Sequence, residues 1–151
     1  TISAGVILTK PSNPLYNSLA LVDQLLRNAK NQEAKASLDY EILYGTGYQP
    51  SEIDGEKRIK KRESQLSAKP YGWLSLSDLL ELASKLKELP TTQLKNLEIL
   101  MSTDPSKERR TLYLERQVGR GFLSIEEAEL LRQLIVSGRF LDAISLTRVL
   151  D

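Results

Sequence analysis

Three observations predict a mainly α-helical protein that begins with a strand–helix–strand segment. Residues 1–8 are small or β-branched around Gly5, which is typical of a buried strand. From residue 75 onward, apolar residues at helical spacing are interrupted by Pro, Gly and capping residues. Between these regions, residues 49–69 show no periodicity. We therefore expect a strand–helix–strand segment over 1–48, a basic linker over 49–72 and an antiparallel bundle of about five helices over 73–151.

The N-terminal segment should contain one helix between two strands. Asn13 can cap a helix whose first residue is Pro14, because the first helical N–H needs no partner. Apolar residues at spacings of three and four then predict one buried stripe: Leu15, Leu19, Val22, Leu26 and Ala29. Residues 36–44 alternate between apolar and polar side chains, so we expect a second strand that pairs with the first.

Capping residues divide the C-terminal region into five helices. The expected starts are Ser75 or Ser77, Thr91 or Thr92, Asp104 followed by Pro105, Ser124, and a last helix that carries Phe140. Ser124 and Glu127 have the spacing of a capping box. The expected buried residues recur at helical spacing: Leu79, Leu82, Leu86, Leu89, Leu94, Leu97, Met101, Ile125, Ala128, Leu131, Ile135, Phe140, Ala143, Ile144 and Leu150.

The residue types that are missing argue against several kinds of active site. The 151 residues include no His and no Cys, so the usual general base, the nucleophilic thiol and the common ligands of zinc, copper and iron are absent. Glu126, Glu127 and Glu129 cluster, but at a helix N-terminus they complement the helix dipole. The glycines at 45–47 and 119–121 lack the P-loop pattern. We expect no independent enzyme, no cofactor and no metal.

The sequence also predicts where the protein acts. No apolar run approaches the roughly 18 residues that a membrane span needs, and residues 1–9 lack the features of a secretory signal. The absence of Cys fits a reducing compartment. We therefore expect a cytoplasmic protein without a membrane partner.

Two groups of cations are candidates for binding nucleic-acid backbone, although the net charge is only +1. The linker group, which otherwise is simply a solvated tract, is Lys57, Arg58, Lys60, Lys61 and Arg62. The helix group is Lys107, Arg109, Arg110, Arg116 and Arg120. Arg109, Arg116 and Arg120 are seven and four residues apart and should share one side of the helix, where guanidinium groups suit phosphate. Ion pairing with Glu108 and Glu115 is the competing interpretation.

Three aromatic residues lie near the basic tracts. Tyr71, Trp73 and Tyr113 have rings on which unpaired bases can stack. For Trp73, directly before a Leu-rich helix, packing in the core is the favoured interpretation.

The N-terminal segment resembles the end of a polymerase-like palm. "TISAGV", then "PLYNSLALVDQLLRNAK" and "SLDYEILYGTG", are similar to the last strand, helix and following strand of the palm in diguanylate cyclases and, more closely, in the large subunit of CRISPR effector complexes. In the CRISPR large subunits a helical domain follows, which matches residues from about Trp73 onward. Lys30 matches a palm lysine that approaches nucleotide phosphate, but the acidic metal-binding loop of the GGDD or GGDEF kind is absent from these residues.

This resemblance implies a structural role in a larger assembly. A palm remnant followed by a helical domain is similar to the small subunit of type I-D CRISPR Cascade complexes. Such subunits contact the large subunit, the backbone subunits, the guide RNA and target DNA, and other copies of themselves. They hold the backbone of the guide–target duplex and of the displaced strand while base pairing reads sequence. The alternatives are a helical protein-interaction module without nucleic-acid contact and a catalytically dead fragment of a cyclase-like palm.

Overall fold

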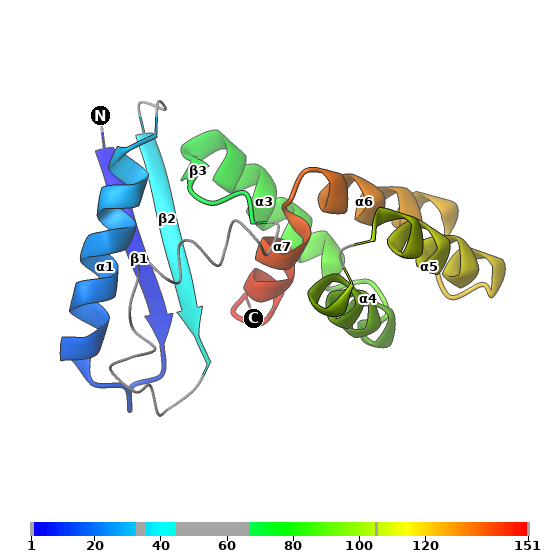
Figure 1. Cartoon of the computed structure of the whole chain (residues 1–151), viewed down its shortest axis with the longest axis horizontal. Helices are drawn as coiled ribbons and strands as arrows, with labels where there is room; N and C mark the ends of the chain where they lie inside the picture. The colour runs from blue at the N-terminus through cyan, green and yellow to red at the C-terminus, as the bar shows by residue number, and fades with distance from the viewer. Residues whose placement is uncertain (1, 33–35, 45–66, 105, 151) are drawn as a thin grey trace. The chain divides into compact units, whose positions relative to one another are not determined.

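The structure, a computed structural model, describes residues 2–32, 36–44, 67–104 and 106–150. The protein is mainly helical, with a small three-stranded sheet near its N-terminus (Figure 1). The described residues form two compact units. The N-terminal unit holds residues 2–32, 36–44 and 68–78, and the helical unit holds Ser67, residues 79–104 and residues 106–150. The predicted class, mainly helical with a strand–helix–strand opening, is confirmed at this level.

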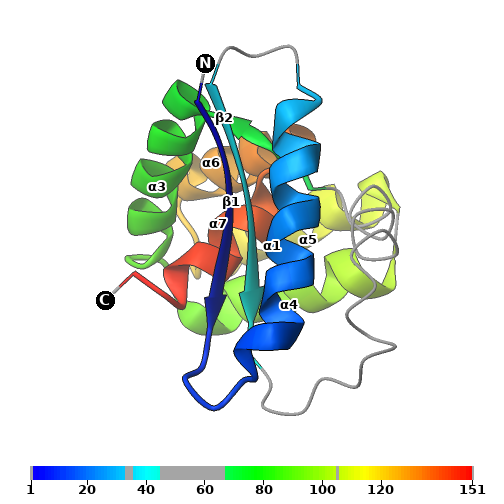
Figure 2. The same ribbon diagram turned by 90° about the vertical axis from the view of Figure 1, so that its left-hand side faces the viewer.

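Two parallel strands and the helix between them form the core of the N-terminal unit. β1 (Ile2–Thr9) and β2 (Ala36–Leu43) pair in parallel along their whole length. Parallel neighbours need a crossover connection, and α1 (Leu15–Lys30) supplies it along one face of the strands (Figure 2). Ile7 of β1 and Leu43 of β2 pack with Leu21 and Leu25 of α1. The predicted pairing of the two strands is confirmed.

The start of α1 differs from the predicted cap. Pro14 occupies the N-cap position without a side-chain cap. The Asn13 side-chain amide donates a hydrogen bond to the Thr9 hydroxyl, and the Asn13 backbone N–H donates to the Lys10 carbonyl at 3.0 Å. The predicted capping role of Asn13 was wrong, because the turn after β1 uses this residue.

The buried face of α1 also differs from the predicted stripe. The buried residues are Ser18, Leu21, Leu25 and Ala29, so only Ala29 of the predicted stripe is fully buried. Leu15 and Leu19 are 73% and 57% exposed, and Val22 and Leu26 are half-buried. Helical spacing identifies residues that share a face, but α1 carries two adjacent apolar faces and the strands cover only one of them.

Polar contacts with β2 hold α1 in this rotation. The Asn28 amide donates to an Asp39 carboxylate oxygen at 2.7 Å, and the Ser37 hydroxyl donates to the Ala29 carbonyl. Asp39 is fully buried. Because a buried carboxylate is costly unless donors surround it, the side of α1 that carries Asn28 is held towards β2.

Gly5 allows α1 to lie directly over β1. A Cβ at Gly5 would be 2.6 Å from the backbone nitrogen of Leu26 and 2.6 Å from the carbonyl oxygen of Val22. No side chain fits at this distance from main-chain atoms, so glycine permits the close approach of strand and helix. α1 accordingly packs more extensively on β1 than on β2.

A third strand forms at the end of the predicted linker. β3 (Tyr71–Gly72) pairs antiparallel with β2. The Tyr71 ring is buried and stacks on Tyr40 with 6.5 Å between ring centroids, and the Lys69 ammonium lies 3.9 Å from the centre of the Tyr40 ring. The linker prediction is therefore corrected at Tyr71 and Gly72, since this aromatic pair ties them to the sheet; residues 49–66 lie outside the described part.

Five helices follow β3. They are α3 (Trp73–Leu86), α4 (Thr91–Thr103), α5 (Lys107–Gly119), α6 (Ile125–Val136) and α7 (Phe140–Thr147). From α4 onward each helix packs against the next, and α3 begins in the N-terminal unit and continues into the helical unit. In the part of the chain that the structure describes, every helix is too short or too polar to cross a membrane.

The predicted helix faces are largely confirmed. Buried as predicted are Leu79, Leu86, Leu89, Leu94, Leu97, Met101, Ala128, Leu131, Phe140, Ala143 and Ile144. Ile125 is the clear exception, because it is 77% exposed and Leu134 is buried on α6 instead. α3 begins at Trp73 rather than at Ser75 or Ser77. Trp73 is 68% exposed, so its predicted core packing was wrong.

The predicted capping box at the start of α6 is confirmed. The Ser124 hydroxyl accepts from Glu127 N at 3.1 Å, and the Glu127 carboxylate accepts from Ser124 N at 2.6 Å. We expect Ser124→Ala to lower the free energy of unfolding by about 1 kcal/mol, because a helix-end donor loses its partner. Urea unfolding measures this loss. The control is Ser102→Ala, whose hydroxyl only donates to the Glu98 carbonyl within α4; equal losses would contradict the capping role.

Candidate nucleic-acid interface

α5 presents the predicted row of arginines at the surface of the helical unit. Arg109, Arg116 and Arg120 are exposed, and Arg120 is the C-cap residue of α5. Their spacings of seven and four residues are about two turns and one turn, so the three side chains leave the same side of the helix. Lys107, also exposed, stands at the first turn. The structure therefore brings four of the five predicted helix cations to the surface.

The first turn of α5 engages one arginine of this row. Arg109 forms an ion pair with Asp104 at 2.6 Å, although the Arg109 side chain remains 72% exposed. Arg116 and Arg120 make no ion pair with any residue in the described ranges. The two guanidinium groups nearest the C-terminal end of α5 thus have the most uncompensated charge in the row.

Arg110 is a structural residue rather than a surface cation. It is only 7% exposed, and its Nη2 donates to the Asp104 carbonyl at 3.1 Å. Arg110 shares its side of α5 with the buried residues Leu114 and Gln117. The expectation that Arg110 contacts phosphate is corrected, because the side chain is packed against the end of α4.

Ser106 and the N-terminal end of α5 hold Glu108, one of the two acidic residues, with Glu115, that were expected to pair with the arginine row. The N-cap of α5 is Ser106, not Asp104 as predicted, and its hydroxyl accepts from Arg109 N at 3.4 Å and donates to Glu108 at 2.9 Å. Hydrogen bonding by its own backbone N–H, followed by that of Ser106, lowers the pKa of Glu108. Glu108 is therefore held by the helix terminus, and the ion partner of Arg109 is Asp104.

Tyr113 links α5 to α4. Its hydroxyl lies 3.2 Å from the Gln93 carbonyl and 3.0 Å from the Gln93 side-chain oxygen. Burial raises the pKa of Tyr113, so the phenol stays a neutral donor. Tyr113 is half-buried and holds two helices together, which leaves its ring less open to a base than that of the exposed Trp73.

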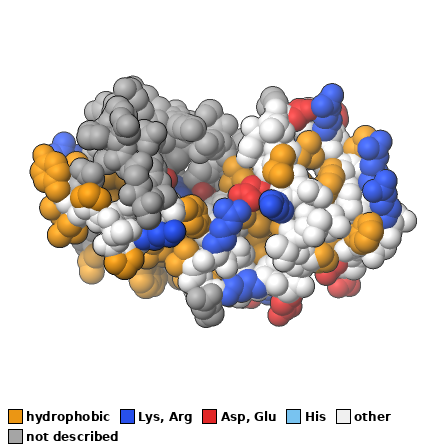
Figure 3. Space-filling model, turned by 90° about the horizontal axis from the view of Figure 1, so that it is seen from below, with side chains coloured by type: hydrophobic (Ala, Val, Ile, Leu, Met, Phe, Trp, Pro, Cys, Tyr) orange, Lys and Arg blue, Asp and Glu red, His pale blue; other side chains and the backbone are white. Residues whose placement is uncertain are grey.

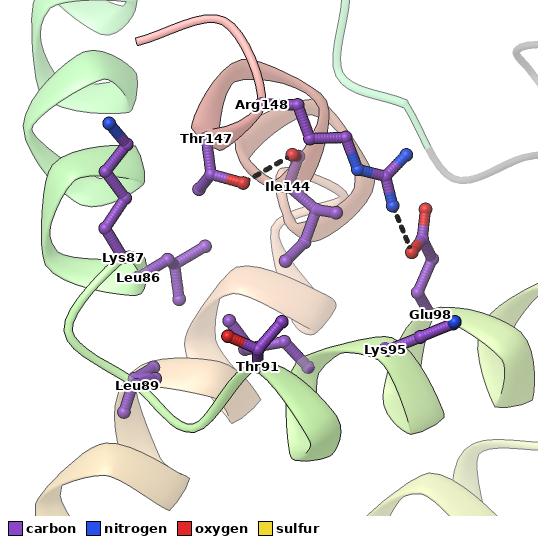
Figure 4. Close-up of a pocket in the computed structure, with 10 residues that line it drawn as sticks. Leu86, Lys87, Leu89, Thr91, Lys95, Glu98, Ile144, Thr147 and Arg148 are labelled. Atoms are coloured by element: carbon purple, nitrogen blue, oxygen red, sulfur yellow. Dashed lines mark hydrogen bonds and ion pairs between the residues drawn. The ribbon is translucent and has the colours of Figure 1, made fainter. Parts of the chain in front are cut away.

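A second group of cations surrounds a pocket that sequence spacing did not reveal. The pocket has a volume of about 450 Å³ and lies between the end of α3, α4 and α7 (Figure 4). Lys87, Lys95 and Arg148 line it together with leucines of the end of α3 and of α4. The Arg148 guanidinium pairs with Glu98 at 2.6 Å, while Lys87 and Lys95 form no ion pair within the described ranges. Arg148 is remote in sequence from Lys87 and Lys95, so only the fold of the helical unit brings the three cations together.

On the face drawn in Figure 3, the cations lie in separate clusters rather than in one continuous band. In Figure 3, groups of Lys and Arg side chains alternate with uncharged surface, and several have carboxylates beside them. Arg132 is paired with Glu129 at 3.0 Å, which fits this pattern. The predicted linker cations Lys57, Arg58, Lys60, Lys61 and Arg62 lie outside the described residues.

Comparison of the chain with protein-family models, with curated proteins and with solved structures finds no match.

Proposed function

We propose that this protein is a non-catalytic subunit that binds nucleic-acid backbone. The observation that carries the proposal is the exposed pair Arg116 and Arg120 on the same side of α5, neither of which forms an ion pair within the described ranges. A guanidinium group binds phosphate through two parallel N–H donors, and such contacts need no base recognition. Lys107, Lys87 and Lys95 add exposed charge on the helical unit.

The resemblance to the palm and helical domain of CRISPR large subunits suggests the assembly in which this protein binds nucleic acid. We propose the role of a small subunit in an RNA-guided surveillance complex, where the protein holds the guide–target duplex and the displaced DNA strand. Its partners would be the large subunit, the backbone subunits and other copies of itself. Base pairing supplies sequence specificity in such complexes, so the protein requires only backbone contacts.

A second candidate function is a protein-interaction module. It is favoured by large apolar side chains that are exposed on the helical unit: Ile125 is 77% exposed, Val136 is 70% exposed and Phe122 is 53% exposed. Scattered apolar residues are common on protein surfaces, and only contiguous patches indicate an interface. The two candidate functions differ in whether the isolated chain binds nucleic acid.

Salt titration distinguishes these two functions. The full chain is mixed with single-stranded and duplex DNA of mixed sequence, and with an RNA–DNA duplex, at increasing salt. If about six phosphates are contacted, the affinity should fall roughly a thousandfold between about 50 and 200 mM salt, because each contact releases counterions. Binding that is absent at low salt, or that does not change with salt, would contradict backbone binding and favour the protein-interaction module.

A further inference from the structure

The outer edge of β1 is a strand edge without a partner among the described residues. The sheet order is β1-β2-β3, so β1 has a neighbour on one side only (Figure 2). β1 has eight residues, Ile2–Thr9, and none of them is charged or proline. Natural proteins usually protect such an edge with lysine, proline, a bulge or a short strand. β1 has none of these features, and the strand order of the described ranges places no neighbour beside its outer edge, so the described part of the chain leaves this edge unpaired.

An apolar face of α1 overhangs this edge. α1 lies directly over β1, since the main chain near Val22 and Leu26 is in contact distance of Gly5. Asn28 and Leu21 face β2, through the hydrogen bond to Asp39 and the packing on Leu43. At about 100° per residue, Leu15, Leu19 and Leu26 leave the opposite side of the helix and extend past β1. On the face drawn in Figure 3, hydrophobic side chains gather on the N-terminal unit.

The edge and the overhanging face together define what can bind there. Unpaired backbone N–H and C=O groups along β1 require an extended peptide, because only another strand satisfies them in series. The helix face requires apolar side chains at alternate positions of that peptide, since alternate residues of a strand point to the same side. The absence of charge along β1 favours an uncharged segment.

A second copy of this chain does not fit as the occupant. Antiparallel pairing of two β1 strands about a two-fold axis would place the strands about 5 Å apart. Each α1 lies over its own β1, so the two helices would also come within about 5 Å, whereas packed helices need about 8–10 Å. A strand with no helix above it avoids this collision.

We propose that the β1 edge and the Leu15–Leu19–Leu26 face of α1 bind an extended, uncharged segment of a partner polypeptide as a fourth strand. The segment pairs with the main chain of β1 and buries its α1-facing side chains under the helix. This interaction surface is independent of the cationic surface of α5, and the proposal stands whether or not the chain binds nucleic acid.

A peptide of eight residues that alternates Val and Thr is a suitable probe. With the full, isotope-labelled chain, we expect amide hydrogen exchange at alternate residues of β1 to be fast in the free protein and at least about tenfold slower with saturating peptide. Leu15→Asp with Leu19→Asp should weaken peptide binding by about tenfold or more without changing the melting temperature, because both side chains are exposed. Ile99→Asp with Leu112→Asp, at two exposed apolar residues of the helical unit, is the matched control and should leave peptide binding unchanged.

A variant of the probe tests the same contact without altering the protein. A peptide with Lys at its α1-facing positions should not bind, because its charges would lie under leucines. The proposal is overturned if the β1 amides that point away from β2 exchange slowly in the free chain at low concentration, because the edge is then already protected. It is overturned if their protection rises with protein concentration in the absence of peptide, because a second copy then occupies the edge. It is also overturned if the peptide shifts only resonances of α3–α7. It is also overturned if the Lys peptide binds equally well.

Discussion

Replacing Gly5 by alanine is expected to lower the free energy of unfolding of the N-terminal unit by about 3 kcal/mol. The new Cβ would lie 2.6 Å from the Leu26 nitrogen and the Val22 oxygen, and 3.1 Å from the Leu25 Cβ. Two of these three atoms belong to the main chain of α1, so no side-chain rotation relieves the contact. The helix must move away from β1, and the packing of the fully buried Leu25 is lost with it.

Hydrogen exchange measures this loss within the unit, because amides of β1 and α1 report its opening separately from that of the helical unit. Gly119→Ala is the matched control. It lies at the end of α5 with nothing within 4 Å of the added Cβ, and it should change stability by less than about 1 kcal/mol, in the stabilising direction. Equal protection of β1 in the Gly5 variant and the wild-type chain would show that α1 does not approach β1 this closely.

The order of elements in the N-terminal unit follows from local sequence, but the rotation of its helix does not. Small and β-branched residues predict β1, and alternation predicts β2, because both signals are local. The leucines of α1 predict an apolar face, yet the strands cover Leu21 and Leu25 instead of Leu15 and Leu19. Contacts with Asp39 and Gly5 decide this rotation, and they depend on how distant segments pack.

The candidate site likewise has parts that local sequence predicts and parts that depend on tertiary packing. The spacing of Arg109, Arg116 and Arg120 predicts one row on α5, because helical geometry alone determines it. The burial of Arg110 depends on the position of α4, although its spacing of four residues from Leu114 already places it on the apolar side of α5. The pocket of Lys87, Lys95 and Arg148 combines residues from separate helices. The predicted helix caps also differ in outcome. The predicted capping box at Ser124 is present, whereas the N-cap of α5 is Ser106 instead of the predicted Asp104.

Reversing the charge of Arg116 and Arg120 together, as Arg116→Glu with Arg120→Glu, is expected to weaken binding to duplex DNA roughly hundredfold at about 100 mM salt. Both side chains are exposed and neither has an ion partner in the described ranges, so their charge is available to phosphate. The salt dependence should fall by about two counterions, since one phosphate contact is lost with each arginine. Titration of labelled DNA at several salt concentrations measures both quantities.

Arg27→Glu with Arg132→Glu is the control that separates a local interface from net charge. It makes the same change in total charge, but Arg27 is paired with Asp23 at 2.8 Å and Arg132 with Glu129 at 3.0 Å. If the two double variants weaken binding equally, the effect is one of long-range charge and the α5 interface is wrong. A loss that appears with one DNA sequence and not with another would indicate base contacts, whereas a backbone interface loses affinity for all sequences alike. Arg116 and Arg120 are on the surface, so the Arg116→Glu, Arg120→Glu variant should keep the thermal stability of the unchanged chain. Its weaker binding can then be assigned to the missing phosphate contacts.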